Sequence, residues 1–138
     1  MDTKEYTENS KLLARVIIDA YQKPADQFDD LEEQVIGAFT FGCHRMFSMQ
    51  EAQVQEWQSK VAMVELLHDV FGFEMEMAGN ALAYFVDCLD PKFSETMHNV
   101  IVCGADAYRL LGQPDELGAA IKKIVAIMSD KLEATDEE

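Results

Sequence analysis

The sequence predicts an all-α protein, a single compact domain of about six helices packed around a central apolar helix at about residues 30–48. Apolar side chains recur every three or four residues in several segments, as an amphipathic helix requires. No segment sustains the alternation of a strand, and no Gly-rich hairpin turn occurs. A chain of 138 residues with 49% hydrophobic side chains can also bury a full core without disulfides or metal.

The central helix is predicted from residues 35–43, where almost every side chain is apolar, small or aromatic. A helix that is apolar around its whole circumference is normally buried. A short apolar run is also compatible with a buried strand, but the capping residues before it favour a helix. Gly37 and Gly42 each cost about 1 kcal/mol relative to alanine inside a helix. We therefore expect both glycines to lie at close contacts between helices.

Acidic residues mark the start of this helix. Asp29 and Asp30 both offer a side-chain oxygen for an N-cap. Glu32 or Glu33, three residues further on from one or the other, would complete a capping box. With Asp26 they make a cluster of five acids, whereas capping needs only one or two, and the surplus predicts a binding surface here.

Five amphipathic segments are expected around the central helix. They lie at about residues 10–23, 51–71, 74–89, 94–111 and 114–133, separated by breaks that include Pro24, Gly72, Pro91 and Gly112. Leu12, Trp57 and Val61 are expected on their buried faces. Residues 1–9 and 134–138 are expected to be mobile tails of the one domain that spans residues 1–138.

The three cysteines, Cys43, Cys88 and Cys103, sit in apolar helical patterns and are expected in the core as reduced thiols. The chain has no charged segment followed by a long apolar one, and no apolar run of transmembrane length. We therefore expect a soluble cytoplasmic protein with no membrane partner.

Charge is the strongest global feature, because 26 acidic residues face 11 basic ones and the net charge is −15. Phosphate would be repelled by such a surface, so nucleic acid is excluded as a direct partner. A basic protein partner is favoured. Excess acid can also serve solubility alone, since the size of a charge carries no specificity.

Catalytic and metal-binding motifs were not found. His44, His68 and His98 fall on different predicted helices, and no zinc-ligand spacing, nucleotide-binding loop or nucleophile elbow occurs. Cys43 precedes His44 but lies in the buried run, where a thiol is usually inert. The sequence therefore predicts no catalytic residues, no metal and no cofactor.

A second candidate surface lies at the start of the segment after Gly72. Glu74 and Glu76 alternate there with Met75 and Met77, and at least one of the two methionines is expected to face solvent. The complete set of residues expected to bind a partner is Asp29, Asp30, Glu32, Glu33, Glu74, Glu76 and His98. Six further acids could extend it: Glu51, Glu56, Asp87, Asp90, Glu95 and Asp106.

Two stretches resemble a known family. Residues 33–42, EQVIGAFTFG, and residues 96–108, TMHNVIVCGADAY, are similar to the two most recognisable segments of a family of bacterial polymorphic-toxin immunity proteins, immunity protein family 48. The resemblance spans roughly residues 10–132. Relatives often carry a His-Arg pair before the glycine of the second stretch, where this chain has Val102-Cys103 before Gly104. No role of that pair is therefore carried over.

The resemblance implies that the protein neutralises a cognate toxin by tight stoichiometric association, without catalysis. An acidic protein suits an intracellular toxin with a basic active-site cleft, such as a nuclease, and complementary charge speeds association. Two alternatives remain open. One is a helical adaptor or regulator that binds a basic protein unrelated to a toxin. The other is a small helical enzyme or ligand sensor that uses His98, Tyr108 and His44. The sequence does not decide the oligomeric state.

Overall fold

Six α-helices form the protein in a computed structural model that describes residues 2–136, with side chains described as far as residue 131. They are α1 (Thr3–Tyr21), α2 (Asp30–Phe47), α3 (Glu56–Asp69), α4 (Met75–Asp87), α5 (Glu95–Asp106) and α6 (Pro114–Asp136). Single 3-10 turns lie at Ala25–Gln27 and Ala107–Leu110, and a π-helical turn lies at Ser48–Ala52. The described residues contain no strand, and the predicted all-α single domain is confirmed.

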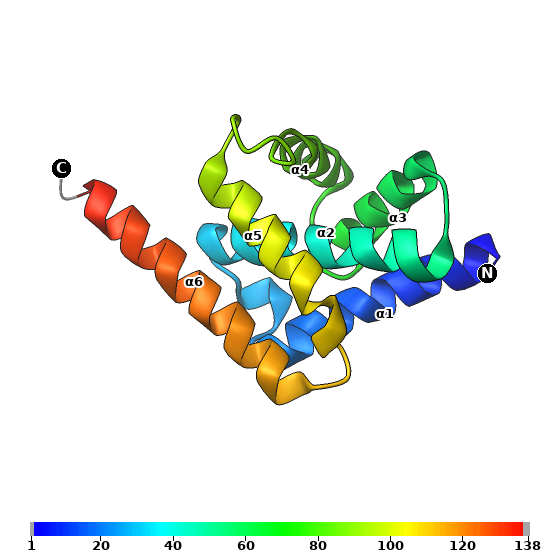
Figure 1. Ribbon diagram of the computed structural model, residues 1–138, viewed down its shortest axis with the longest axis horizontal. Coiled ribbons are helices and arrows are strands. Elements are labelled where there is room, and N and C mark those ends of the chain that lie inside the picture. The colour runs from blue at the N-terminus through cyan, green and yellow to red at the C-terminus, as the bar shows by residue number, and fades with distance from the viewer. Residues whose placement is uncertain (1, 137–138) are drawn as a thin grey trace.

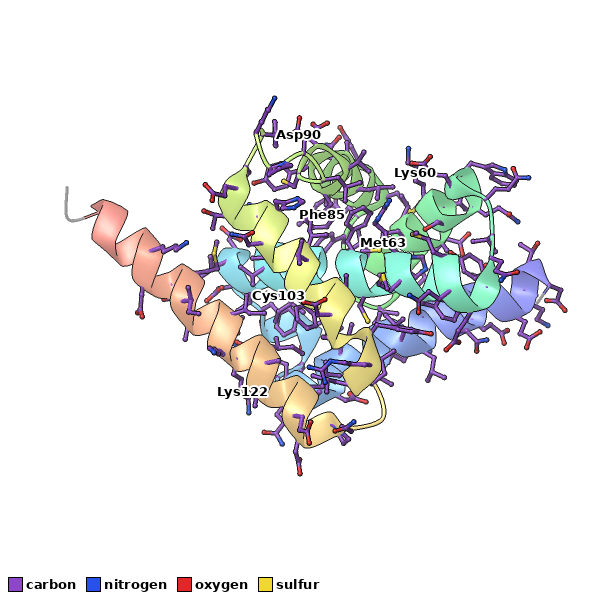
Figure 2. All side chains as sticks on the ribbon, in the orientation of Figure 1. Lys60, Met63, Phe85, Asp90, Cys103 and Lys122 are labelled. Atoms are coloured by element: carbon purple, nitrogen blue, oxygen red, sulfur yellow. The ribbon has the colours of Figure 1, made fainter. Side chains whose placement is uncertain are left out.

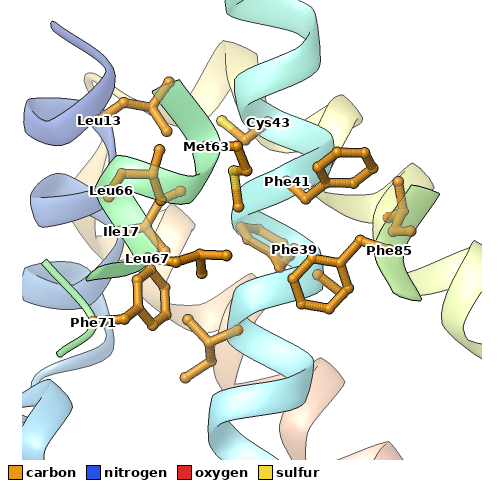
Figure 3. Close-up of a cluster of buried hydrophobic side chains, with 14 of the residues drawn as sticks. Leu13, Ile17, Phe39, Phe41, Cys43, Met63, Leu66, Leu67, Phe71 and Phe85 are labelled. Atoms are coloured by element: carbon orange, nitrogen blue, oxygen red, sulfur yellow. The ribbon is translucent and has the colours of Figure 1, made fainter. Parts of the chain in front are cut away.

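Helix α2 lies at the centre of the molecule, with the other helices around it (Figure 1). Every residue from Val35 to His44 is buried, as expected of a helix that is apolar on all sides. Side chains of α1, α3 and α4 converge on α2, and Figure 3 shows Ile17, Met63 and Phe85 reaching toward it. The predicted central helix is therefore confirmed within one residue at its C-terminal end.

The crossing of α2 and α5 is the closest helix contact described here. A Cβ atom added to Gly42 would lie 2.0 Å from the carbonyl oxygen of Ile101. A Cβ atom added to Gly104 would lie 2.0 Å from the carbonyl oxygen of Phe39. Each glycine therefore lets its helix rest on the backbone of the other. The two stretches that resemble the immunity family contain this crossing, and the expectation for Gly42 is confirmed.

Gly37 has a different neighbour from the one expected. The nearest atoms to a Cβ added there belong to the ring of Phe85, with Cζ at 3.0 Å. The space above Gly37 is therefore filled by an aromatic side chain from α4 and not by the backbone of another helix. Figure 3 shows this ring beside α2, next to Phe41. The glycine positions α4 relative to α2.

The first helix begins at Thr3 and not near Ser10, so the expectation of a mobile tail at residues 1–9 is wrong from residue 3 onward. The side chain of Asp2 accepts the backbone N–H three residues further on, at 2.7 Å, and caps the helix. Tyr6 is only 2% exposed, and its hydroxyl lies 2.7 Å from Oγ of Ser48. This buried anchor orders a segment whose polar composition suggests fraying.

Four residues that the sequence places in the core are exposed. Trp57 is 62% exposed and Val61 is 51% exposed, because the buried face of α3 does not include their positions. The buried residues of α3 are Ala62, Met63, Leu66 and Leu67. Leu12 and Cys103 are also exposed, whereas Cys43 and Cys88 are buried as expected.

At the C-terminus, α6 packs against the end of α1. A Cβ added to Gly118 would lie 2.4 Å from the carbonyl oxygen of Ala20, so this contact also depends on a glycine. The backbone remains helical through Asp136, beyond the start of the tail expected at 134–138, and residues 137–138 lie outside the described residues.

Candidate functional site

A groove between α2 and α4 brings together the two surfaces singled out in the sequence. Its volume is about 450 Å³. The lining residues are Asp30, Glu33, Gln34, Phe73, Met77, Asn80, Ala81, Tyr84 and Phe85. A volume of this size lies within the range of sites that take a small ligand or a large side chain, roughly 300–1,000 Å³.

The floor of the groove is apolar and fixed by the core. Phe73 is 4% exposed and Phe85 is 2% exposed, and the Phe85 ring also contacts α2 above Gly37. Phe85 is labelled between α4 and the rest of the molecule in Figure 2. Met77 is 45% exposed, and its flexible side chain can adapt to a partner. The groove therefore combines rigid aromatic rings with an adaptable edge.

The edge on α2 is acidic. Asp30 and Glu33 are three residues apart in the first turn, so their side chains share one face of the helix. Among the described residues, neither forms an ion pair with a basic side chain. Partial burial, and then the nearby charges of Asp30 and Asp29, raise the pKa of Glu33 above its ordinary value. A cation placed here would relieve that repulsion.

The other two acids of this turn serve the fold. Asp29 is the N-cap of α2, and it forms a reciprocal capping box with Glu32 at 2.8 and 3.0 Å. Glu32 is only 4% exposed and accepts hydrogen bonds from the Tyr21 hydroxyl at 2.5 Å and from Lys23 Nζ at 2.7 Å. Its carboxylate is thus already satisfied internally, and its assignment to a partner-binding surface is corrected.

Burial by itself would raise the pKa of Glu32. The hydrogen bonds from Lys23, from Tyr21 and from the backbone N–H of Asp29 overcome that effect and hold the pKa below its ordinary value. The group is therefore a buried anion that ties the α1–α2 connection to α2.

Glu74, Met75 and Glu76 lie at the start of α4 and are all exposed, with Met75 at 54%. Both methionines of this segment, Met75 and Met77, therefore face solvent, but only Met77 lines the groove. Glu74 occupies the N-cap position of α4 without accepting a capping hydrogen bond. The two glutamates add negative charge beside the groove without forming its wall.

His98 does not line the groove. Its Nδ1 donates to the carbonyl oxygen of Cys88 at 3.1 Å, just after α4 ends. His68 Nδ1 donates to the carbonyl oxygen of Phe73 at 2.7 Å, just before α4 begins. The two histidines therefore hold α4 at both of its ends, and the contact that His98 makes here is structural.

A polar cluster is buried between α1 and α2. His44 is 0% exposed, with its Nε2 2.8 Å from Ser10 Oγ and 3.3 Å from the Tyr6 hydroxyl. Burial lowers the pKa of His44 to about 4, so the ring is neutral at pH 7. His44 bonds to Ser10 and Tyr6, whereas His98 bonds to Cys88. These hydrogen bonds do not join His44, His98 and Tyr108 into the enzyme or ligand site considered as an alternative above.

In the part of the chain that the structure describes, no three His, Cys, Asp or Glu residues are grouped so that they could hold a metal ion. Within residues 2–136, none of the helices combines the length and apolar character needed to cross a membrane.

Groove residues that sequence reasoning missed include Gln34, Phe73 and Asn80. They come from the start of α2, the connection before α4 and the first turns of α4. The spacing of Met77, Ala81 and Tyr84 places them on one face of a helix, but spacing cannot show which neighbouring helix lies beside that face.

The fold and the groove define a small acidic helical protein whose candidate site is a surface for binding. Residues 6–129 match the family model described as Immunity protein 48, and the chain belongs to that family. Membership implies that it is an immunity protein with a toxin as its partner. No curated protein and no solved structure matches the chain. The resemblance seen in the sequence is thus confirmed.

Proposed function

We propose that this protein neutralises its cognate toxin in the cytoplasm of the producing bacterium by stoichiometric binding, without catalytic turnover. The toxin carries a basic surface, as the active-site cleft of a nuclease does. The observation that supports this most directly is the groove between α2 and α4, where Asp30 and Glu33, which form no ion pair among the described residues, border an apolar floor.

The charge of the chain favours this partner. A net charge of −15 attracts a basic protein over a distance and raises the rate of encounter, most strongly at low ionic strength. Exposed acids at the border of a contact mainly change the association rate, whereas a desolvated carboxylate paired with Arg or Lys slows dissociation. Glu74 and Glu76 fit the first role, and Glu33, which is already partly buried, fits the second.

The test requires the toxin, which is sought first in the gene immediately upstream. Binding kinetics are measured at two ionic strengths for the parent and for Asp30→Asn/Glu33→Gln. The control is Asp115→Asn/Glu116→Gln, which removes the same charge from the first turn of α6. We expect the groove variant to associate more slowly, with a weaker salt dependence, and to dissociate faster than the control.

Protection is measured in parallel by co-expression with the toxin. The parent should restore growth at equimolar expression, because neutralisation by binding is stoichiometric. Growth that is restored by traces of the protein, far below the toxin concentration, would show turnover and contradict the proposal. Equal kinetics for the groove variant and the control would remove the α2 acids from the contact.

A further inference from the structure

We infer that the groove between α2 and α4 takes one large apolar side chain of the toxin together with an adjacent Arg or Lys. The apolar side chain rests on Phe73 and Phe85, and the cation lies against Asp30 and Glu33. This inference rests on the proposed function and specifies the segment that the toxin presents.

The shape of the groove supports a single inserted side chain. About 450 Å³ is enough for one large group, and the floor consists of aromatic rings that the core already holds in place. Aromatic and aliphatic anchors that enter such preformed pockets are typical of the residues that dominate binding energy. Met77, at the edge, can adjust its rotamer to the shape of the anchor.

The chemistry of the rim specifies what accompanies the anchor. Asp30 and Glu33 offer two carboxylates on one side of the apolar floor. On the same wall, Nε2 of Gln34 donates to the Tyr84 hydroxyl at 3.2 Å and bridges α2 to α4. The planar guanidinium of arginine can donate to two carboxylates at once, so Arg fits this rim better than Lys.

Charge also separates this partner from the other occupants of such a groove. A second copy of the chain would bring another −15 to an acidic rim, and a nucleic acid would bring phosphate. Both are repelled. A segment that combines an apolar group with a cation satisfies the floor and the rim together.

The first test uses a small probe and does not need the toxin. Phenethylguanidinium carries a phenyl ring and a guanidinium, and 2-phenylethanol carries the ring alone. We expect backbone amide NMR shifts at residues 33–34 and 80–84 with the guanidinium probe, and binding roughly tenfold weaker with the alcohol. In Asp30→Asn/Glu33→Gln the difference between the probes should disappear. Equal binding of both probes to the parent, or shifts centred elsewhere, would overturn the inference.

The second test blocks the groove in the complex. Ala81 lines it, whereas Ala83 is exposed on α4 and does not, so Ala81→Trp and Ala83→Trp introduce the same side chain on the same helix. We expect Ala81→Trp to weaken toxin binding at least roughly tenfold, and Ala83→Trp to bind like the parent. Thermal unfolding of both variants shows whether the fold is kept.

Met77→Ser and Met75→Ser supply a second pair if Ala81→Trp unfolds. Both methionines are exposed, and only Met77 lines the groove, so Met77→Ser alone should weaken binding. If the parent protects against the toxin and both pairs bind equally, the groove is not the docking site, although neutralisation stands. If the parent does not bind the toxin, the proposed function itself fails.

Discussion

Replacing Gly42 with alanine should strongly destabilise the protein, because α2 and α5 touch backbone to backbone at this point. The added Cβ would lie 2.0 Å from the carbonyl oxygen of Ile101, whereas ordinary contacts begin at 3.4 Å. The two helices would have to separate by more than 1 Å along the most extensive helix contact in the structure. The atom that the added Cβ meets belongs to the backbone, which cannot rotate away as a flexible side chain can.

The magnitude follows from two opposed effects. Overpacking a close contact costs about 1–3 kcal/mol and occasionally more. The higher helix propensity of alanine returns up to about 1 kcal/mol. Because a carbonyl oxygen is the obstacle, we expect the upper end of the first range and a net loss of about 2 kcal/mol. Gly79→Ala in α4 is the control: nothing lies within 4 Å of its added Cβ, so this change should stabilise by up to about 1 kcal/mol.

The measurement is the free energy of unfolding from urea denaturation, with circular dichroism as the probe. Gly104→Ala, which meets the carbonyl of Phe39, should cost a similar amount. The double variant Gly42→Ala/Gly104→Ala should cost less than the sum, because one separation of the helices accommodates both methyl groups. If Gly42→Ala is as stable as Gly79→Ala, the close crossing is not present in solution and the reasoning is refuted.

Two further predictions concern buried ionisable groups. Glu32→Gln should cost about 1–3 kcal/mol at pH 7, since it weakens charged hydrogen bonds with Lys23 and Tyr21. Because the pKa of Glu32 is lowered by folding, its contribution to stability is present above the unfolded pKa of 4.5 and is lost as the pH falls through the folded pKa. Urea titrations at several pH values should show that Glu32→Gln lacks this part of the acid dependence of stability. For His44, the folded pKa of about 4 lies below the ordinary value of 6.5, so the unfolded state binds more protons between these two pH values. The free energy of unfolding should therefore fall as the pH is lowered from 6.5 to 4, by up to about 1.4 kcal/mol per pH unit. A proton NMR titration checks this directly, and a His44 midpoint near 6.5 would contradict it.

The fold could be predicted from the sequence because helical periodicity survives in most segments. The capping residues before the apolar run around Gly42 and the helical spacing after Ser94 both favour helices, and the structure agrees with both. Trp57 and Val61 were misplaced because a large apolar side chain does not reveal which face of its helix is covered.

The candidate site was predictable in part. The surplus of acids around Asp30 indicates one wall of the groove and Met77 indicates the other, but neither pattern shows that the two walls lie close together. The sequence places Glu32 on the same surface, because the position of a carboxylate in the first turn does not show whether it faces water or pairs with Lys23. Only the packing of the α1–α2 connection against α2 distinguishes these cases.

The α2–α5 crossing and the groove depend on different residues. Gly42 and Gly104 accept no other side chain without moving a backbone. Met77 and Asn80, by contrast, are exposed on α4. On the proposal that the groove binds the toxin, single exchanges on α4 can remodel the contact surface while the α2–α5 crossing keeps the fold.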